Sequence, residues 1–221
     1  GNAKGFSEDV GRAWEKTFSD GHHEGVRQIA MRISFVLGQE DGAFPVLRRL
    51  AKRGLGGAQG PGTQWMSWLH IDDWVGIVRF LIENESIIGP VNLTAPNPVT
   101  NADFMKEMRK HFAPLGIGLP APSFAVHIGS LFLGTAPELV LKSRKVVSRI
   151  LKDNSYNFKY PTLERGIMRP KNGAFPVKKI VCNEFCRHNI FSLGILHSFL
   201  KVFKFLCKSI LSCHYFIWLN N

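Results

Sequence analysis

The sequence predicts an α/β protein with a partial parallel sheet, and three stretches carry this prediction. Residues 26–37 form a largely apolar run that ends at Gly38, which is typical of a strand buried in a sheet. Residues 64–70 have extended-chain preferences and lead directly into helical apolar spacing. Residues 89–94 form a third, short strand. Because strands alternate with helices along the chain, we expect a sheet covered by helices.

The stretch from Gln64 to Asp73 organises the rest of the chain. Three large side chains with polar tips crowd the point where its strand meets its helix: Trp65, Trp68 and His70. We expect Asp72 or Asp73 to cap the helix by accepting hydrogen bonds from amide groups of the first turn. Tryptophan and histidine at a strand end also serve as ordinary packing residues, so a purely structural role is the alternative to ligand contact.

A helix from Ser7 to about Phe18 precedes the first strand, with acidic residues in its first turn where the helix dipole favours them. Inside the first strand, Arg32 interrupts the apolar run. A buried guanidinium is costly without a partner. Arg32 therefore either forms a salt bridge within the fold or faces a ligand.

The region between the first two strands is basic and rich in glycine. A short helix from 42 to 53 carries a basic face, which is typical of a solvated surface. Five glycines then fall between Gly54 and Gly62. Such density allows close approach of the backbone to another group, or it produces a mobile loop. The pattern lacks the Gly-Lys-Ser/Thr of a phosphate-binding loop.

Helices dominate after the third strand. Thr100 or Asn101 is expected to cap a helix that runs to Phe112, and apolar segments at 123–132 and 137–151 predict two more helices. These helices predict a small α-rich lobe packed beside the main sheet.

The basic charge is concentrated in the last quarter of the chain. The formal net charge is +11, but residues 165–221 hold nine of the 28 basic residues and only one of the 17 acidic residues. A nucleic-acid interface inferred from overall charge would rest on this tail alone, so we expect no nucleic-acid partner. All four cysteines also lie in the tail, and a body without cysteine fits a reducing compartment. The first residues form no apolar signal, which predicts a cytoplasmic or organellar location without secretion.

The tail from 165 to 221 allows three interpretations. It could lie on an anionic membrane as a basic amphipathic helix. It could hold a metal through its cysteines and histidines, although their spacing matches zinc sites poorly. We favour the third interpretation, an aberrant extension that is no evolved domain, and expect neither membrane contact through the tail nor a metal site. The adjacent His22, His23 and Glu24 are likewise interpreted as a solvated loop.

Several ordered motifs in the first 164 residues resemble the epimerase-like family of the extended short-chain dehydrogenases/reductases. They are Trp14-Glu15, the run from Arg32 to Gly38, the glycines from Gly54 to Gly62, the stretch from Gln64 to Asp73, Gly89-Pro90-Val91-Asn92 with Ala95-Pro96, Val99-Thr100-Asn101, and Phe158-Lys159-Tyr160-Pro161. Bacterial members of this family are described as cell-division-inhibitor-like proteins or sugar nucleotide epimerases, and a plant member acts in chloroplast division. The resemblance covers about three quarters of the chain and does not extend to the tail.

The resemblance implies a Rossmann-type sheet that binds NAD or NADP. Residues 1–95 would form the C-terminal part of this cofactor-binding domain, residues 96–164 a small substrate lobe, and residues 165–221 a tail outside the family. The family's opening strand and glycine-rich dinucleotide turn would lie upstream of Gly1, so we expect a C-terminal fragment without the pyrophosphate site. A sheet cut from its first strands would also expose an unpaired edge.

The resemblance also implies site residues. The segment that crosses the nicotinamide end of the cofactor matches one short run and the arginine beside it: Arg32, Phe35, Val36 and Leu37. The superfamily's acid/base tyrosine and lysine align with Ser7 and Gly11, which carry neither a phenol nor an ammonium group. The catalytic residues are therefore left unidentified.

We expect a small-molecule substrate to reach the site between the glycine-rich loop and the small lobe, against four residues: Gln64, Trp65, Trp68 and His70. Their amide and imidazole could orient a hydroxyl or carbonyl, while the indoles cover an apolar face. These features predict part of an NAD(P)-dependent oxidoreductase or epimerase-like protein, a part that is inactive alone. The alternative is a non-catalytic nucleotide-binding or division-associated protein with the same fold.

Overall fold

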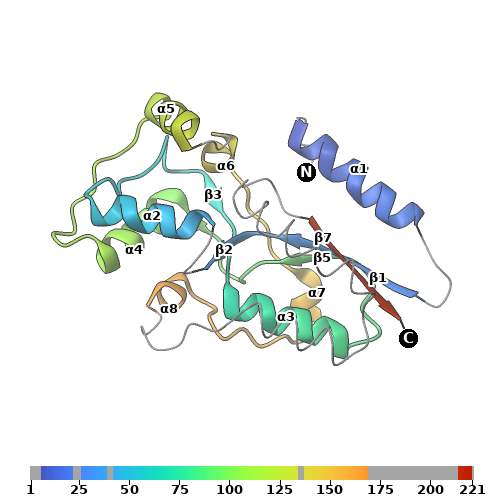
Figure 1. Cartoon of the computed structure of the whole chain (residues 1–221). Coiled ribbons are helices and arrows are strands. Elements are labelled where there is room, and N and C mark those ends of the chain that lie inside the picture. The colour runs from blue at the N-terminus through green and yellow to red at the C-terminus, as the bar shows by residue number, and fades with distance from the viewer. Residues whose placement is uncertain (1–5, 22–25, 39–41, 134–136, 169–213, 221) are drawn as a thin grey trace.

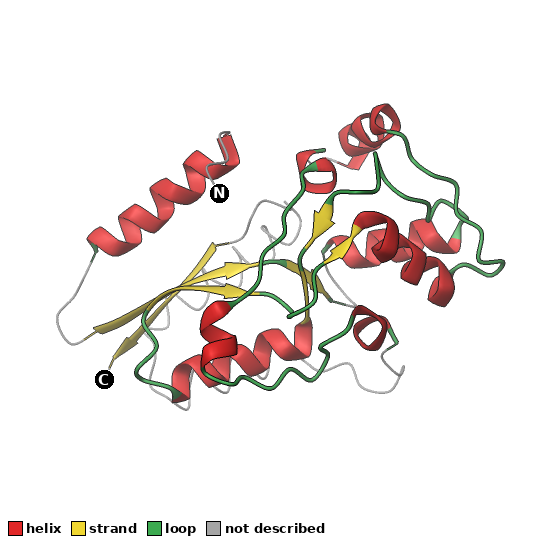
Figure 2. Cartoon of the chain, turned by 180° about the vertical axis from the view of Figure 1, so that it is seen from behind, coloured by secondary structure: helices red, strands yellow, loops and turns green. Residues whose placement is uncertain are grey.

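The computed structural model describes residues 6–21, 26–38, 42–133, 137–168 and 214–220. It is an α/β fold in which a small sheet lies beside a helix-rich end (Figures 1 and 2). The predicted α/β class is therefore confirmed.

The main sheet has the order β5-β1-β7. Strand β1 (Val26–Ile33) runs parallel to β5 (Gly89–Leu93), and the pairing places Arg32 opposite Asn92. The prediction of a parallel sheet at Arg32 is thus confirmed. On its other side β1 pairs antiparallel with β7 (His214–Asn220). The expected unpaired edge therefore does not lie at β1, because this strand is central and β5 and β7 form the edges of the described sheet.

Helices cover both faces of this sheet (Figure 1). Helix α3 (Ile71–Glu83) and α7 (Arg149–Asp153) pack on one face, while α1 (Phe6–Asp20) lies on the other. The buried core on this face combines side chains of β1 and β5 with side chains of α3 and α7: Ile29, Met31, Val91, Leu93, Trp74, Ile77, Val78, Leu81 and Leu151. Arg27 is also buried here and donates hydrogen bonds of 2.9–3.1 Å to four carbonyls at the C-terminal end of α3 and the loop after it.

A second core lies at the helix-rich end. The short strands β2 (Phe35–Leu37) and β4 (Trp68–His70) pair in parallel, and three helices enclose them. These are α2 (Ala43–Lys52), α4 (Asn101–Phe112) and α8 (Leu163–Ile167). Apolar side chains of β2 and of these helices form one buried cluster with Trp68: Leu37, Phe44, Leu47, Phe104, Met105, Met108, Leu163 and Ile167.

The remaining elements lie beside this second core. Strand β3 (Trp65–Met66) pairs antiparallel with β6 (Val99–Thr100). Helix α5 (Ser123–Leu133) and the short α6 (Glu138–Leu141) follow. Thr100 caps α4 through a hydrogen bond from the Asp103 amide, which confirms one of the two predicted caps.

Three predicted elements are interrupted in the structure, two of them at a serine. The strand expected over 26–37 divides at Ser34, and the one expected over 64–70 divides at Ser67. The Ser67 hydroxyl bonds the backbone of Arg144 and Val146, which ties the crossing segment to this point. The helix expected over 137–151 is two helices, α6 and α7, because the chain between them bonds to β3 and Ser67.

The expected boundary after residue 164 falls inside α8, whose Gly166 and Ile167 are buried. The cysteines of the tail and the His22-His23-Glu24 segment lie outside the described residues. Among the described residues, no three His, Cys, Asp or Glu side chains come together as a metal site would require. No helix in the described ranges has the length and apolar character needed to cross a membrane.

Candidate functional site

The junction of β4 and α3 is built around a buried histidine. His70 has no exposed surface, and its Nδ1 atom accepts a hydrogen bond of 3.1 Å from the Asp72 amide. His70 is therefore the N-cap of α3. The prediction that Asp72 or Asp73 caps this helix is wrong, because both carboxylates lie in the first turn and face a different segment.

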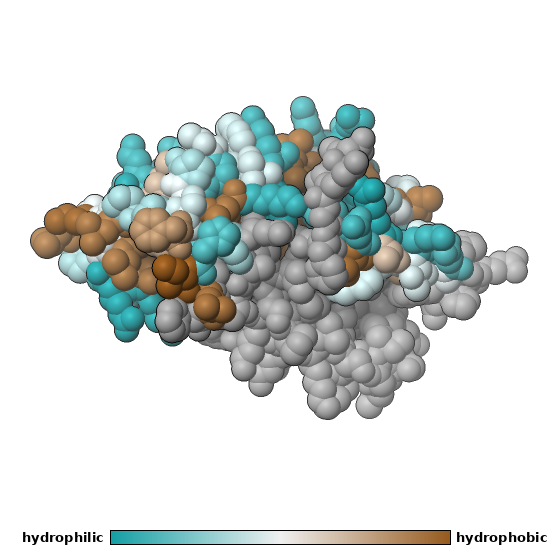
Figure 3. All heavy atoms as spheres, turned by 90° about the horizontal axis from the view of Figure 1, so that it is seen from above, coloured by the Kyte–Doolittle hydropathy of each residue, from teal (hydrophilic) through white to brown (hydrophobic). Residues whose placement is uncertain are grey.

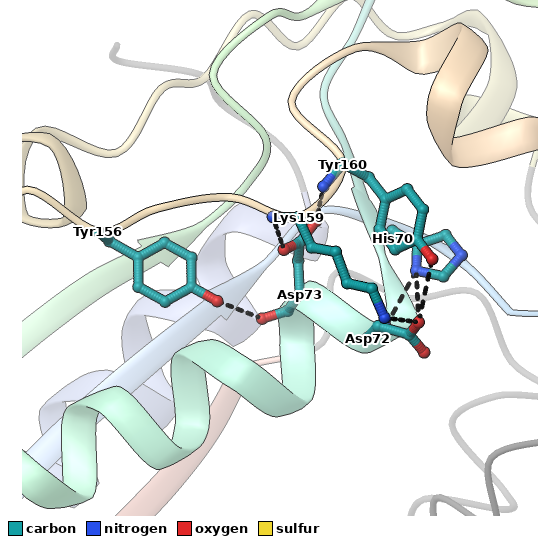
Figure 4. A network of polar contacts seen from close by, with 6 residues as sticks. All are labelled: His70, Asp72, Asp73, Tyr156, Lys159 and Tyr160. Atoms are coloured by element: carbon teal, nitrogen blue, oxygen red, sulfur yellow. Dashed lines mark hydrogen bonds and ion pairs between the residues drawn. The ribbon is translucent and has the colours of Figure 1, made fainter.

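Asp73 fastens a distant part of the chain to this helix (Figure 4). Its buried carboxylate accepts hydrogen bonds from two consecutive backbone amides, Lys159 at 2.7 Å and Tyr160 at 3.0 Å. Burial raises the pKa of Asp73 above its ordinary value, although these two hydrogen bonds act in the opposite direction. Removing the carboxylate would leave both amides without their acceptor.

Asp72 joins the same network and connects it to the exposed side chain of Lys159. One of its carboxylate oxygens lies 3.3 Å from Lys159 Nζ, 3.3 Å from the Tyr160 hydroxyl and 3.9 Å from His70 Nδ1. The rings of His70 and Tyr160 are 4.0 Å apart between centroids. Burial acts to lower the pKa of Lys159, but its contacts with Asp72 and Tyr160 together outweigh burial and raise it.

Tyr156 completes the attachment. Its hydroxyl donates a 3.3 Å hydrogen bond to the Asp73 backbone carbonyl, and burial raises the pKa of its phenol. Segment 156–160 is therefore anchored to the start of α3 by both backbone and side chains. The sequence prediction missed this role of Lys159 and Tyr160. The signal for it was a carboxylate pair beside a buried helix face, since a buried carboxylate requires donors.

The predicted cofactor residues on β2 lie beside the predicted substrate residues on β4. Phe35 is paired with Trp68 and Leu37 with His70 in the parallel register. Leu37 is buried, whereas Phe35 and Val36 retain partial exposure. Phe35 also makes an edge-on contact with Phe104 at 5.5 Å between ring centroids. The fold thus brings two separately predicted groups together.

Arg32 lies apart from that pair of strands. It forms a two-point salt bridge with Glu15 of α1, with nitrogen–oxygen distances of 2.6 and 2.7 Å. This hydrogen bond raises the pKa of the guanidinium. Of the two roles considered for Arg32, the structure shows the salt bridge.

The four predicted substrate residues have different environments. Trp68 is fully buried, and its indole N–H donates to the Asn97 carbonyl at 2.9 Å. Buried Gln64 donates to the carbonyls of Gln59 at 2.7 Å and Val140 at 3.2 Å. Its Oε1 atom has no hydrogen-bond partner within the described part of the chain.

Trp65 is the partly exposed member of the four. The ammonium group of Lys145 lies 3.8 Å from the centroid of its ring, which is a cation–π contact. The two residues are 80 positions apart, so no local sequence signal could pair them. Trp65 therefore offers an aromatic face with a positive charge beside it.

The backbone of the glycine-rich loop lies close against residues 119–121, which agrees with one of the two interpretations of its glycines. Gly54, Gly57, Ala58 and Gly60 exchange backbone hydrogen bonds of 2.8–3.0 Å with Leu119 and Ala121. A Cβ atom at Gly57 would lie 2.4 Å from the Leu119 backbone. We expected a substrate to enter between this loop and the small lobe. That expectation is wrong along residues 54–60, because hydrogen bonds join the loop directly to residues 119–121 there.

Ser7 and Gly11, which align with the superfamily's catalytic pair, both lie in α1. Gly11 is buried. Parallel strand pairs, helices on both faces and site candidates at strand ends define a protein of the Rossmann-type α/β class.

Comparison with known proteins narrows this class. A family model described as a domain of unknown function (DUF1731) matches residues 121–167. The epimerase family protein YfhF of Bacillus subtilis is 33% identical over 164 residues, which are 72% of this chain and 51% of that protein. A chloroplastic epimerase family protein of Arabidopsis thaliana is also 33% identical, over 72% of this chain and 44% of that protein.

Two solved structures share the fold. The human epimerase family protein SDR39U1, crystallised with NADPH, superposes with a TM-score of 0.56 at 30% identity and covers 64% of this chain and 47% of that one. A nucleoside-diphosphate sugar epimerase from Corynebacterium glutamicum gives a TM-score of 0.57 at 26% identity, over 84% of this chain and 39% of that one. The resemblance to the epimerase-like family of the extended short-chain dehydrogenases/reductases is confirmed. The chain spans about half the length of the relatives it matches.

Proposed function

We propose that this chain is part of an NAD(P)-dependent oxidoreductase or epimerase that acts on a small molecule. The observation that carries the proposal is the similarity, in both sequence and fold, to a human epimerase family protein that was crystallised with NADPH. When bound, such a cofactor would supply hydride transfer. The finer claims, on the residues that would contact it, rest on the geometry of β2 and β4.

Strand β2 fits contact with the nicotinamide end of the cofactor. In open α/β sheets, ligands bind outside the carboxyl ends of parallel strands. Phe35 and Val36 keep exposed surface in the parallel pair of β2 and β4, while buried Leu37 holds the pair in place. The guanidinium of Arg32 is engaged in a salt bridge with Glu15, so it would contact a cofactor while keeping that bridge.

The substrate would lie against Trp65 and Gln64. The partly exposed indole of Trp65 supplies a face for an apolar or ring surface, with Lys145 beside it. The Oε1 atom of Gln64 could accept a hydrogen bond from a substrate hydroxyl. Trp68 and His70 are buried and would not contact the substrate; their hydrogen bonds would hold β4 and the start of α3 in place.

Titration with NADPH and NADH tests the proposal, in the longer protein that includes the dinucleotide-binding turn implied by the family resemblance. We expect binding in the micromolar range, weakened about tenfold by Val36→Glu, as for loss of a central contact. The exposed Val147→Glu serves as the matched control and should leave affinity unchanged. If neither NADPH nor NADH binds, the proposal is wrong.

A second candidate is a nucleotide-binding protein without turnover. It is favoured by Ser7 and Gly11, which occupy the positions where the family resemblance places the acid/base pair. Cofactor oxidation measured against a panel of small carbonyl compounds and sugar nucleotides separates the two. Binding without any turnover supports this candidate, and measurable hydride transfer excludes it.

A further inference from the structure

An exposed apolar surface covers the end of the molecule that carries α5. It consists of six large side chains from α5 and the loop before it, each between 55% and 81% exposed: Leu115, Ile117, Leu119, Phe124, Ile128 and Leu131. We call this surface the apolar cap. Figure 3 shows hydrophobic side chains gathered at this end of the molecule, beside hydrophilic ones. A cluster of this kind on a water-soluble surface marks a site of interaction.

The backbone forces these side chains outward. Gly118 lies against the glycine-rich loop and Arg109, where a Cβ atom would meet Arg109 at 2.3 Å and the Gly56 backbone at 2.7 Å. Alternate residues of an extended segment face opposite sides. Ile117 and Leu119 therefore face away from the protein. In α5, Phe124, Ile128 and Leu131 share one helix face by their spacing of four and three residues.

Acidic residues are absent from the segment that carries the apolar cap and from the glycine-rich loop that is joined to it. No Asp or Glu occurs in residues 42–71, and residues 113–137 contain neither acidic residues nor Lys or Arg. The end of α2 exposes three basic side chains: Arg49, Lys52 and Arg53. The 2.8 Å hydrogen bond from the Leu119 amide to the Gly54 carbonyl brings the C-terminal end of α2 close to the apolar cap.

We propose that the apolar cap docks on the surface of an anionic lipid membrane. Apolar side chains flanked by Lys and Arg are the composition that inserts shallowly between anionic headgroups. The site is distinct from the cofactor and substrate residues. A second copy of the chain fits less well, since a two-fold contact through this surface would bring basic rims of the same sign together.

Vesicle flotation with the full chain tests the docking surface. The probes are phosphatidylcholine vesicles with and without phosphatidylglycerol. We expect wild-type protein to float with the anionic vesicles, and Leu115→Asp combined with Leu131→Asp to reduce the bound fraction at least about tenfold. Lys52→Glu combined with Arg53→Glu should reduce binding to anionic vesicles by about fivefold or more for each charge and have little effect with neutral ones.

Ile88→Asp is the matched control, because Ile88 is 67% exposed in the loop before β5 and lies outside the apolar cap. It should float as wild type does, with circular dichroism confirming that all variants fold. Equal binding by wild type and the Leu115/Leu131 variant would overturn the proposal, since binding would then come from the basic tail. Failure of wild type to float, or self-association abolished by the same variant without vesicle binding, would overturn it as well.

Discussion

The start of α3 and the apolar cap differ in how far the rest of the chain covers them. At the start of α3, His70 and Asp73 are buried, and segment 156–160 is held over them by hydrogen bonds from main chain and side chains. At the apolar cap, large side chains remain exposed although an entire helix supports them. This difference indicates that the first region stabilises the fold, whereas the exposure of the second fits the proposed docking on a membrane surface.

Asp73→Ala should have the largest effect on stability. The substitution leaves the Lys159 and Tyr160 amides without their acceptor, and each buried donor costs about 1–3 kcal/mol. We expect a loss of about 3 kcal/mol in the free energy of unfolding, measured by urea titration. The exposed Asp153→Ala should change it by no more than about 0.5 kcal/mol. Equal effects of both variants would show that the attachment of segment 156–160 contributes little.

Gly57→Ala tests how firmly the glycine-rich loop is joined to the segment below the apolar cap. An added Cβ would lie 2.4 Å from the Leu119 backbone, which cannot yield as a side chain can. Overpacking of this kind costs about 1–3 kcal/mol. Gly129→Ala in α5 is the control, because no atom lies within 4 Å of its added Cβ and alanine favours a helix by up to about 1 kcal/mol. A neutral Gly57→Ala would contradict the close approach.

The pH dependence of stability sharpens the role of Asp73. Its pKa is raised in the folded protein by burial, so the unfolded chain loses this proton first as the pH rises. The contribution of Asp73 is fully present below its ordinary pKa of 3.8 and decreases as the pH rises through the folded pKa. Urea titrations of wild type and Asp73→Asn between acidic and neutral pH should show this decrease in their difference. An increase would reverse the assignment of burial as the dominant cause.

Glu15→Gln should have the smallest effect on stability. The bridge from Arg32 to Glu15 is partly exposed to solvent, and such pairs contribute about 0–1 kcal/mol. Thermal unfolding should therefore shift only slightly, and less at high salt. If Arg32 also contacts the cofactor, Arg32→Ala should weaken NADPH binding more than Glu15→Gln does. Equal affinities would restrict Arg32 to the salt bridge.

Local signals predicted much of the fold. The parallel strand at Arg32, the helix from Asn101 and its Thr100 cap follow from short apolar and polar patterns. What failed depends on contacts between distant residues. The break at Ser34 arises because its amide and hydroxyl bond the Leu93 carbonyl, and the break at Ser67 arises because its hydroxyl bonds the backbone of Arg144 and Val146. Asp73 meets amides more than 80 residues away. The pairing of Trp65 with Lys145 is equally remote in sequence.

Hydrogen exchange of the proposed longer protein with and without saturating NADPH tests the central claim most directly. The claim is that β2, beside β4, contacts the nicotinamide end of the cofactor. NADPH should slow exchange of the amides in residues 34–38 and leave those in residues 113–131 unchanged. Protection confined to other segments, with residues 34–38 exchanging at the same rate in both states, would contradict it.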